Sequence, residues 1–412
     1  MKIAFIVSRF PVLSETFILN QITGLIDLGH EVEIFAKSNP KDKKIHSDVY
    51  NYDLIEKVHY FNLPHNKFER IIKALFIIFK NFHKSPLVIL NSLNLFKYGK
   101  EAFSLNLLYS VVPFLNKKFD IIHCHFGPNG NIGIKLKEIG IPGKYVTSFH
   151  GHDANSYPKI KGKNIYNYLF KKGDLFIANT NFTKDQLINI GCDEKKIVIL
   201  PVGLRVERFK FSTKKIKKND SIKILTIGRL VEKKGHKYII EAIAKVIHKN
   251  KGIKYIIAGD GPLRYELKEL VKNLNLERYV KFLGVVDQDE VLEIYQQSHI
   301  FVLPSVTAKN EDREGQALVI QEAQAMGLPV ISTLHNGIPE GVINGKSGFL
   351  VPEKDINALV EKLEYLIEHP EIWPAMGRCG REFIEKKYNI QDLNNQLVKI
   401  YQELYYKDIT EP

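Results

Sequence analysis

The sequence predicts an α/β protein made of two doubly wound, Rossmann-like domains that face each other across a cleft. Its 412 residues are too many for one compact core, so two domains are expected. Both halves alternate short apolar segments with amphipathic helical segments, which favours parallel sheets. Residues 201–209, followed by the polar segment FSTKKIKKND, are the expected linker between the halves.

In the first half, short apolar runs bounded by turn residues predict strands. A helix is expected to begin near Thr16 and to end at Gly29, because glycine commonly terminates helices. The expected strands are KIAFIVS (2–8), HEVEIFA (30–36), DIIHCHF (120–126), YVTSFH (145–150), DLFIANT (174–180) and KIVILPVG (196–203).

The second half repeats this alternation and ends in residues 381–407, which are expected to form one or two helices. Ligands of such sheets bind at the carboxyl ends of the strands, so the active site is expected in the cleft between the domains. The expected strands are 222–229, 253–261, 280–286, 299–305 and 328–333, and the expected helices are 238–247, 263–275 and 290–298.

The composition is that of an ordinary soluble globular protein, with 44% hydrophobic and 25% charged residues. No apolar run approaches the roughly 18 residues of a membrane span, and Ile3–Val7 is too short for the core of a signal peptide. We therefore expect a cytoplasmic protein, either free or peripheral on the inner face of the membrane. The scattered cysteines Cys124, Cys192 and Cys379 predict neither a disulfide framework nor a zinc site.

The net charge of +13 indicates an anionic partner, such as nucleic acid, anionic lipid or a phosphorylated small molecule. Residues 66–118 carry nine basic and two acidic residues, interleaved with apolar runs such as FIIF and LVIL. This combination fits a surface that rests on an anionic bilayer, and a lysine-rich solvated face over core helices is the alternative. No zinc-finger, RNP or helix-turn-helix signature is present, so nucleic acid is not expected as a partner.

The segment EGQALVIQEAQAMG (314–327) predicts a buried helix that begins at Gly315 and stops at Gly327. Glu314 then lies just outside the helix and Glu322 about two turns inside it, which separates them by roughly 12 Å. This separation is too large for one bond-breaking step but suits contacts at opposite ends of an elongated ligand. The alternative is a capping acid together with a buried, paired glutamate.

Two features predict a diphosphate site near the start of this helix. Arg229 and Lys234 follow a strand, and two cations with exposed backbone N–H groups can hold a diphosphate without a metal. The helix start at Gly315 adds the free amides near Leu318 and Val319 and the positive end of the helix dipole.

The two glutamates extend this ligand at both ends. Glu322 is positioned to accept hydrogen bonds from the two hydroxyls of a ribose, and Glu314, at the open end, is positioned to hold a second sugar. The predicted ligand is therefore a nucleoside, a diphosphate and a sugar in one molecule.

Several segments of the chain resemble the retaining glycosyltransferases of the GT-B fold, in the large family 4 group. The matching segments are GRLVEKKG (228–235), GDGPL (259–263), the two glutamates separated by seven residues, and GIPEGVINGKSGFLV (337–351). The opening segment SRFPVLSETFILNQI (8–22) resembles a subset that builds bacterial capsule, colanic-acid-like or lipopolysaccharide chains. The resemblance covers essentially the whole chain and is most specific in the second half.

The resemblance implies transfer of a sugar from a nucleotide-diphosphate sugar of the UDP or GDP type, with retained anomeric configuration. It implies no required metal or other cofactor, and an acceptor that is a glycan or a lipid-linked glycan. Arg229 and Lys234 fall on the family's diphosphate-binding pair, and the neighbouring Lys233 leaves open which lysine makes the contact. Glu322 falls on the ribose-binding glutamate and Glu314 on the donor-sugar glutamate.

In the first half, His150 matches the family's active-site histidine, which contacts the donor sugar; a satisfied histidine at a strand end is the alternative. Asp153 is expected to orient or hydrogen-bond nearby groups. Ser14 and Glu15 lie in the loop where this family approaches the phosphates or the acceptor, and capping of the helix near Thr16 is the alternative.

We expect an acceptor-side domain at 1–203 and a nucleotide-sugar-binding domain at 204–385. The resemblance implies that the terminal helix, here 386–412, crosses back onto the first domain. The chain departs from the family at Gln316-Ala317, where an aromatic residue and a glycine are more usual, so the packing of this loop is expected to differ.

Two patterns that look like metal sites are assigned other roles. Asp287-Gln288-Asp289 spells the DxD of metal-dependent glycosyltransferases, but it directly precedes the helix 290–298 and is expected to cap it. His123 and His125 share one face of a strand, yet no third ligand is near. We therefore expect no metal site, and we expect His125 to face the cleft.

Two other functions remain open from the sequence. A nicotinamide-dependent oxidoreductase also uses paired Rossmann-like domains, but SRFPVLSE follows the first strand in place of G-x-G-x-x-G. A non-catalytic module that binds sugar nucleotides or anionic membrane would not need the intact cationic pair and glutamates.

Overall fold

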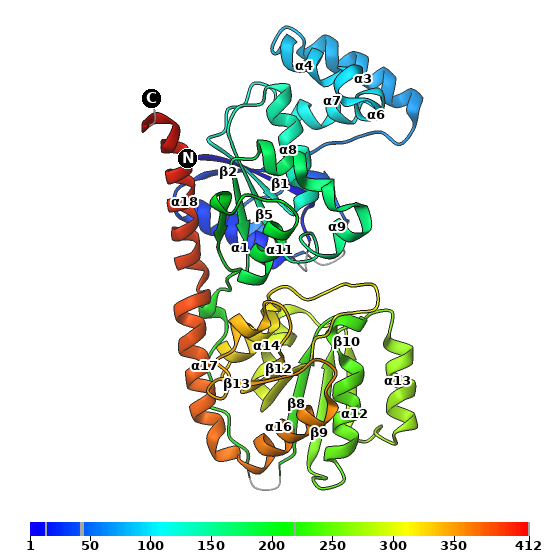
Figure 1. Ribbon diagram of the computed structural model, residues 1–412, viewed down its shortest axis with the longest axis vertical. Helices are drawn as coiled ribbons and strands as arrows, with labels where there is room; N and C mark the ends of the chain where they lie inside the picture. Colours follow the sequence, from blue (N-terminus) through cyan, green and yellow to red (C-terminus); the bar gives the residue numbers. More distant parts are fainter. Residues whose placement is uncertain (13–14, 42–44, 218–219, 411–412) are drawn as a thin grey trace.

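The computed structural model describes residues 1–12, 15–41, 45–217 and 220–410, with the backbone alone for 407–410. It contains two parallel sheets of seven and six strands, and each sheet is covered by helices on both faces (Figure 1). The predicted fold class of two Rossmann-like domains is confirmed. Within the described residues, no helix combines the length and the apolar character needed to cross a bilayer.

The first sheet has the strand order β3-β2-β1-β4-β5-β6-β7, and all neighbouring strands are parallel. The strand β3 was not expected, because three residues are too few to show a periodic pattern. The strands are β1 (Lys2–Arg9), β2 (Glu31–Ser38), β3 (Val58–Tyr60), β4 (Ile121–His125), β5 (Lys144–Phe149), β6 (Leu175–Ala178) and β7 (Ile197–Ile199).

Side chains of β1 alternate between the two faces of this sheet, as expected for a strand. Ala4 and Ile6 enter the core on one face, whereas Ile3, Phe5 and Val7 enter the core on the other. Both faces of the sheet are therefore buried, which is typical of parallel sheets.

The helices of the first half include five, α3 to α7, that lie between β3 and β4 in the sequence. These five form a separate layer at the top of Figure 1, which we call the helical insertion. The helices are α1 (Thr16–Asp27), α2 (Ser47–Asn51), α3 (Lys67–Asn81), α4 (Pro86–Ser92), α5 (Leu95–Tyr98), α6 (Lys100–Phe103), α7 (Asn106–Val111), α8 (Gly127–Ile139), α9 (Ser156–Lys161), α10 (Asn167–Lys172) and α11 (Asn181–Asn189).

The second sheet has the order β10-β9-β8-β11-β12-β13, which is the order of a dinucleotide-binding Rossmann fold. Its last strand, β13, was not expected as a strand. The strands are β8 (Ile222–Ile227), β9 (Ile253–Ala258), β10 (Val280–Gly284), β11 (Ile300–Leu303), β12 (Val330–Thr333) and β13 (Gly348–Val351); the helices are α12 (His236–Val246), α13 (Arg264–Asn273), α14 (Gln288–Gln297), α15 (Leu318–Ala325), α16 (Ile356–Glu368) and α17 (Trp373–Tyr388).

The last helix, α18 (Ile390–Thr410), leaves the second half and packs on the first (Figure 1). Whereas α17 packs on α15, α18 packs on α1, and Leu397 and Tyr401 join the core beneath β1. Gly24 makes this contact possible, since a Cβ built on it would lie 1.8 Å from the Asn394 amide nitrogen. The two long helices therefore tie the two sheets together.

The expected linker is packed rather than loose. The backbone N–H of Leu204 donates to the Tyr388 carbonyl at 2.9 Å, and the N–H of Ile390 donates to the Leu204 carbonyl at 3.1 Å. Val206 and Phe209 are buried in the core of the second half. The two crossings of the chain between the halves therefore lie side by side.

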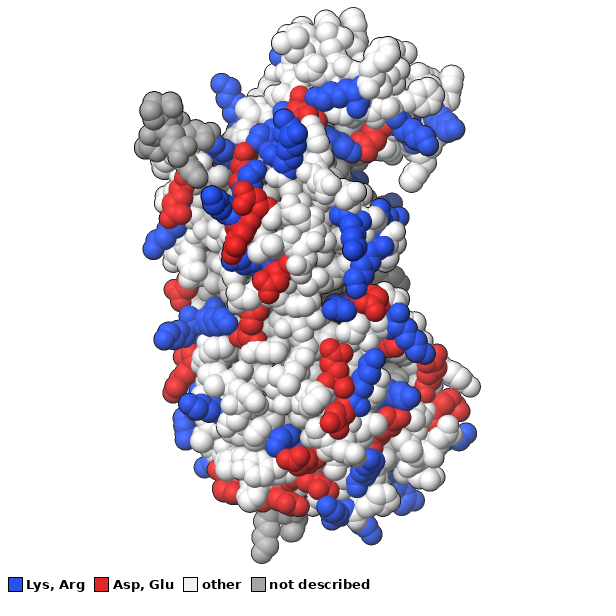
Figure 2. All heavy atoms as spheres, viewed as in Figure 1, with Lys and Arg blue, Asp and Glu red and all other residues white. Residues whose placement is uncertain are grey.

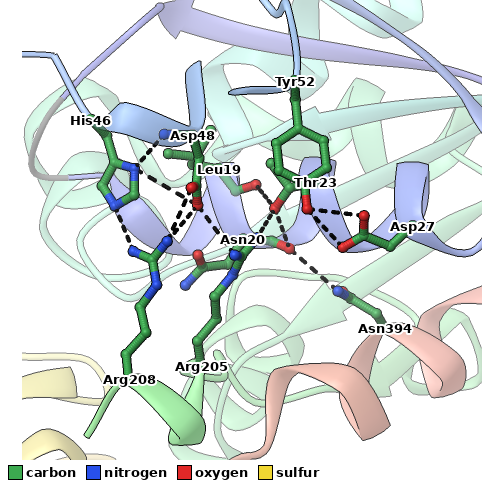
Figure 3. Close-up of polar contacts among 10 residues, drawn as sticks. All are labelled: Leu19, Asn20, Thr23, Asp27, His46, Asp48, Tyr52, Arg205, Arg208 and Asn394. Carbon is green, nitrogen blue, oxygen red and sulfur yellow. Dashed lines mark hydrogen bonds and ion pairs between the residues drawn. The ribbon is translucent and has the colours of Figure 1, made fainter. Parts of the chain in front are cut away.

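Charged side chains also fix the linker to the first half (Figure 3). The buried Asp48 carboxylate accepts two hydrogen bonds from Arg208, at 2.9 and 3.0 Å, and pairs with Arg205 at 3.3 Å. Arg205 also donates to the Thr23 hydroxyl at 2.6 Å, and Arg208 contacts the His46 ring at 2.9 Å. A single carboxylate thus anchors both arginines of the linker.

Candidate active site

The site lies where the carboxyl ends of the two sheets face each other. In both sheets the strand order reverses between the first and fourth strands, and open α/β sheets bind ligands at such switch points. His150 follows β5 in the first sheet, and Gly228 follows β8 in the second. A Cβ built on Gly315 would lie only 2.7 Å from the His150 carbonyl oxygen. The first half and the predicted donor-sugar loop are therefore in direct contact.

Lys234 and Glu314 form an ion pair at the centre of this site, with 2.5 Å between Nζ and Oε2. Only 12% of the lysine side chain and 14% of the glutamate side chain are exposed. The stem of Lys234 crosses Gly228, since a Cβ built on that glycine would lie 3.5 Å from the lysine Cδ. The structure thus brings together two residues that the sequence assigns to neighbouring parts of one ligand, the diphosphate and the donor sugar.

The charge of Glu314 is set by the basic residues around it. Burial alone would raise the pKa of Glu314, but Lys234 and Lys233 outweigh burial and hold that pKa below its ordinary value. Glu314 is therefore ionised at neutral pH. The sequence left open which lysine meets the ligand, and the structure separates the two. Lys233 donates to the Asp312 carboxylate at 3.2 Å and to the Arg313 carbonyl at 3.3 Å, away from the pair.

Two residues that were not expected at the site hold the backbone of Glu314. Its N–H donates to Nε2 of His335 at 3.1 Å, and its carbonyl accepts from the Asn336 side chain at 3.0 Å. Nδ1 of His335 in turn donates to Glu353 at 2.6 Å. The only sequence signal for them is their position directly before the segment 337–351.

The second expected cation, Arg229, is exposed. Its guanidinium makes no hydrogen bond or ion pair within the part of the chain that the structure describes. The structure therefore does not bring Arg229 into the Lys234–Glu314 pair, and its charge remains available to a ligand.

The helix α15 begins at Leu318, three residues later than the predicted start at Gly315. Ala317 adopts a left-handed conformation, with φ 56° and ψ 67°. This conformation prevents α15 from extending back to Gly315. The side chain of Gln316 is engaged by the linker, because its amide accepts from the Val202 N–H at 2.7 Å and donates to the Val202 carbonyl at 2.6 Å. The departure from the family at residues 316 and 317 thus produces a contact between the two halves.

The amides of Leu318 and Val319 lie in the first turn of α15, where backbone N–H groups have no acceptor inside the helix. Glu322 lies in the second turn, not two turns inside the helix as the sequence suggested. Its Oε2 accepts a hydrogen bond from the Tyr295 hydroxyl at 3.0 Å. Burial raises the pKa of Glu322, and the bond from Tyr295 only partly offsets this. The two glutamates of the motif thus have pKa shifts of opposite direction.

In the first half, the site is lined by stacked histidines. His125 and His150 stack with 5.3 Å between ring centroids, and Nδ1 of His125 lies 3.1 Å from Nε2 of His150. Burial lowers the pKa of His150 to about 3 and that of His125 well below its ordinary value, so both rings are neutral. Among the described residues, Nδ1 of His150 and Nε2 of His125 have no hydrogen-bond partner.

A third ring extends this stack toward the C-terminal helix. His123 and His125 stack at 4.5 Å, which confirms that they share one face of the strand. His123 contacts the Tyr401 hydroxyl of α18 at 2.5 Å and the Ser148 hydroxyl at 2.7 Å. We expected His125 to face the cleft, but its side chain is buried. It reaches the site by its contact with His150.

Asp153 joins two loops of the first half. Its carboxylate accepts from the His150 N–H at 2.8 Å and from the N–H of Gly127, the first residue of α8, at 2.9 Å. Burial raises the pKa of Asp153, although these bonds oppose the shift. The carboxylate thus orients the backbone that carries His150.

The loop after β1 is described only in part. The helix α1 begins at Thr16, as predicted, and within the described residues the side chain of Glu15 makes no capping hydrogen bond. Burial raises the pKa of Glu15. Ser14 lies outside the described residues.

The DxD pattern has the capping role that the sequence predicted. Asp287 accepts from the Glu290 N–H at 3.0 Å, and Glu290 accepts from the Asp287 N–H at 2.7 Å, which forms a capping box on α14. Among the residues with described positions, no three His, Cys, Asp or Glu side chains are grouped to hold a metal ion.

Further contacts join the halves beside the site. They involve the loop before Glu314 and the segment after β12. The contacts are Lys159 with Glu311 at 2.7 Å, His152 with Asp312 at 3.3 Å, and Asn181 with Glu340 at 2.8 Å.

Solved structures share this arrangement over nearly the whole chain. The crystal structure of Anabaena Alr3699/HepE in complex with UDP and glucose has a TM-score of 0.70 at 18% identity, and the alignment covers 98% of this chain and 100% of that one. Sucrose-phosphate synthase from Thermosynechococcus elongatus has a TM-score of 0.71 at 19% identity, with 99% and 100% covered. The fold is GT-B, the two-domain fold of a large class of glycosyltransferases.

Sequence comparison defines the family within that class. Residues 14–208 match the family model for Glycosyltransferase Family 4, and residues 207–383 match that for Glycosyl transferases group 1. The amylovoran biosynthesis glycosyltransferase AmsK of Erwinia amylovora is 34% identical, over 98% of this chain and all of AmsK. WcaL of Escherichia coli K12, named as a candidate colanic acid biosynthesis glycosyltransferase, is 35% identical over 98% of this chain and all of WcaL.

The chain therefore belongs to the family 4 glycosyltransferases and is an enzyme of that family. The resemblance stated from the sequence is confirmed. The sequence left two other functions open, a nicotinamide-dependent oxidoreductase and a non-catalytic module. Both alternatives give way to a glycosyltransferase.

Proposed function

We propose that this enzyme transfers a sugar, with retained configuration and without a metal, from a UDP- or GDP-linked donor to a glycan or lipid-linked glycan. The names of its relatives, in amylovoran and colanic acid biosynthesis, support a role in bacterial surface polysaccharide synthesis. The observation that carries the proposal is the mostly buried Lys234–Glu314 pair, which lies beside the contact between Gly315 and His150.

In this proposal Lys234, Arg229 and the amides of Leu318 and Val319 hold the diphosphate. These groups stabilise the negative charge that collects on the diphosphate as the anomeric bond breaks. The ion pair holds Lys234 in position, because the Glu314 carboxylate balances its charge while no donor is bound. The diphosphate then replaces Glu314 as the partner of Lys234 and frees that carboxylate for the hydroxyls of the donor sugar.

The remaining residues bind the ends of the donor. Glu322 accepts from the ribose hydroxyls, and the unpartnered Nδ1 of His150 hydrogen-bonds the donor sugar. Asp153 keeps His150 in place, and Ser14 and Glu15 approach the phosphates or the acceptor. Attack on the same face of the sugar uses the leaving phosphate as the base, so no carboxylate nucleophile is needed. Two cations and the helix amides serve in place of a metal ion, and no other cofactor takes part.

Movement of the two domains would control access to this site. We place the domain limits at 1–203 for the acceptor side and 204–385 for the nucleotide-sugar side, with 386–412 as the crossing helix. The paired crossings at Leu204 and Ile390 support this division. Closure of the cleft excludes water and limits hydrolysis of the donor. We place the enzyme in the cytoplasm, at the inner face of the membrane, where a lipid-linked acceptor and an anionic lipid surface are available.

A donor screen tests the proposal directly. Thermal shift against UDP- and GDP-sugars identifies the donor, and release of UDP or GDP on addition of acceptor measures turnover. We expect Glu314→Ala and Lys234→Ala each to lower turnover by roughly 10²-fold or more, as for loss of a group that stabilises transition-state charge. Lys237→Ala, at an exposed lysine that pairs with Glu241, is the control and keeps full turnover. Near-normal turnover in both site variants would refute the assignment.

A further inference from the structure

The helical insertion exposes apolar side chains on a scale that single surface residues do not explain. On α3, Phe79 is 86% exposed and Phe76 is 64% exposed, and on α6 Phe103 is 81% exposed. Contiguous exposed apolar surface on a soluble protein marks a binding surface. Large hydrophobic side chains of the insertion that are exposed are Phe68, Ile71, Ile72, Leu75, Phe76, Phe79, Phe82, Leu87, Leu90, Leu95, Phe96 and Phe103.

The exposed side chains of α3 follow one stripe of the helix. Phe68, Ile72, Leu75 and Phe79 recur at spacings of three and four residues, so they line one face. Ala74, on the opposite face, is buried against the protein. The helix thus packs with one face and presents an apolar face outward.

This outward face belongs to a firmly attached layer. Arg70 donates to the Pro64 carbonyl at 2.7 and 2.9 Å and to the Ser104 carbonyl at 3.2 Å, and the Tyr109 hydroxyl donates to the Arg70 carbonyl at 2.8 Å. Glu101 accepts from Lys135 of α8 at 2.5 Å. Incomplete packing of the insertion therefore does not account for the exposure.

Basic residues accompany the apolar face. Residues 66–118 carry nine lysines and arginines against two glutamates. Figure 2 shows the insertion at the top of the molecule as a largely white surface bordered by blue side chains. Within the described residues, Lys80, Lys84 and Lys100 make no ion pair, and all three are exposed. The alternative from the sequence was a lysine-rich solvated face over core helices. It does not fit this exposed face, because the face is itself apolar.

We propose that the outward face of the helical insertion docks on an anionic lipid bilayer, with the aromatic and aliphatic side chains of α3, α4, α5 and α6 entering the interface and the lysines meeting lipid phosphates. Apolar insertion beside basic residues is the pattern of helices that lie in the plane of a membrane surface. The inference rests on the proposed function for its biological purpose, since it brings the first domain to a lipid-linked acceptor. It depends on no residue of the donor site.

Sedimentation of the full-length protein with vesicles tests this face. Phosphatidylcholine vesicles with and without phosphatidylglycerol are the two lipid arms. We expect Phe76→Ser with Phe79→Ser to lower the partition coefficient by about tenfold or more in the anionic arm, because two phenylalanines that would enter the bilayer interface are lost. Lys80→Glu with Lys84→Glu should lower it by about tenfold in the anionic arm alone. Tyr265→Ser with Val285→Ser, at residues 75% and 78% exposed in the second domain, is the matched control and binds as the unmodified protein does.

The outcomes separate docking from catalysis and from self-association. Docking variants are expected to keep their affinity for the nucleotide, and Glu314→Ala is expected to keep its binding to vesicles. Equal binding of the two phenylalanine replacements and the control would overturn the docking proposal and leave the donor site untouched. A lipid-free dimer whose dissociation follows Phe76→Ser with Phe79→Ser would also overturn it, because the face would then belong to a second copy of the chain.

Discussion

The two domains share the order of their first six strands, yet they contribute opposite chemistry to the candidate site. The second domain contributes ionised groups, with Lys234 and Glu314 paired at 2.5 Å and Arg229 exposed. The first domain contributes neutral imidazoles, the half-buried His150 and the buried His125 behind it, stacked at 5.3 Å. One topology can therefore offer either a charged or an uncharged surface to a ligand. A charged diphosphate matches the surface of the second domain, and sugar hydroxyls match that of the first.

The largest loss of turnover is expected when a charge is removed from the second domain. We expect Lys234→Met to lower turnover by roughly 10²- to 10³-fold, because the leaving diphosphate loses a preplaced cation. Lys233→Met is the matched variant, since Lys233 is directed toward Asp312 and Arg313. It should lower the melting temperature while turnover stays within about tenfold. Steady-state release of UDP or GDP, with circular dichroism of each variant, makes the measurement. Equal losses of turnover in the two variants would contradict the separate roles of these lysines.

A smaller effect is expected when the neutral surface is altered. His125→Phe keeps a ring against His150 but removes the hydrogen bond to it, and we expect kcat to fall by about tenfold through misplacement of that ring. Tyr401→Phe, which removes the hydroxyl next to His123, is the control and should change kcat less. Nitrogen chemical shifts of His150 report its tautomer. If the tautomer and kcat both stay unchanged in His125→Phe, His125 has no positioning role.

The opposite pKa shifts of Glu314 and Glu322 predict how nucleotide affinity depends on pH. Burial raises the pKa of Glu322, so this carboxylate takes up a proton as pH falls while Glu314, held low by Lys234, is still ionised. A protonated Glu322 accepts hydrogen bonds from ribose hydroxyls less well, so nucleotide affinity should decrease on acidification. This decrease should begin at a higher pH than the usual glutamate range, because the pKa of Glu322 is raised. Calorimetric titration of UDP or GDP against pH measures this. Glu322→Gln should bind more weakly and lose this pH dependence, and a retained dependence would assign it to another group.

The smallest effect concerns the loop that joins the two surfaces. Ala317 has φ of 56°, and Ala317→Gly should stabilise the protein by about 0.5 to 1 kcal/mol by relieving this strain. Gly315→Ala is the counterpart of opposite sign, because its Cβ would lie 2.7 Å from the His150 carbonyl oxygen. Denaturant unfolding of the two variants makes the comparison. A destabilised Ala317→Gly would show that the left-handed residue is not strained.

Much of the fold could be predicted because the strands and helices are periodic in the sequence. Alternating apolar segments predicted the two parallel sheets, and Asp287-Gln288-Asp289 predicted the cap of α14. The short strands β3 and β13 were missed, since three or four residues carry too little pattern. The start of α15 was placed at Gly315 because the engagement of Gln316 by Val202 has no local signal.

The fold class, the family and the set of candidate site residues could be read from the chain, because they depend on local spacing and on short motifs. The arrangement of those residues came from the folded molecule. It paired Lys234 with Glu314, turned Lys233 toward Asp312, stacked His125 on His150 and left the aromatic face of α3 uncovered. Each of these depends on contacts between segments far apart in the chain, whose burial sets both the partner and the charge of every group.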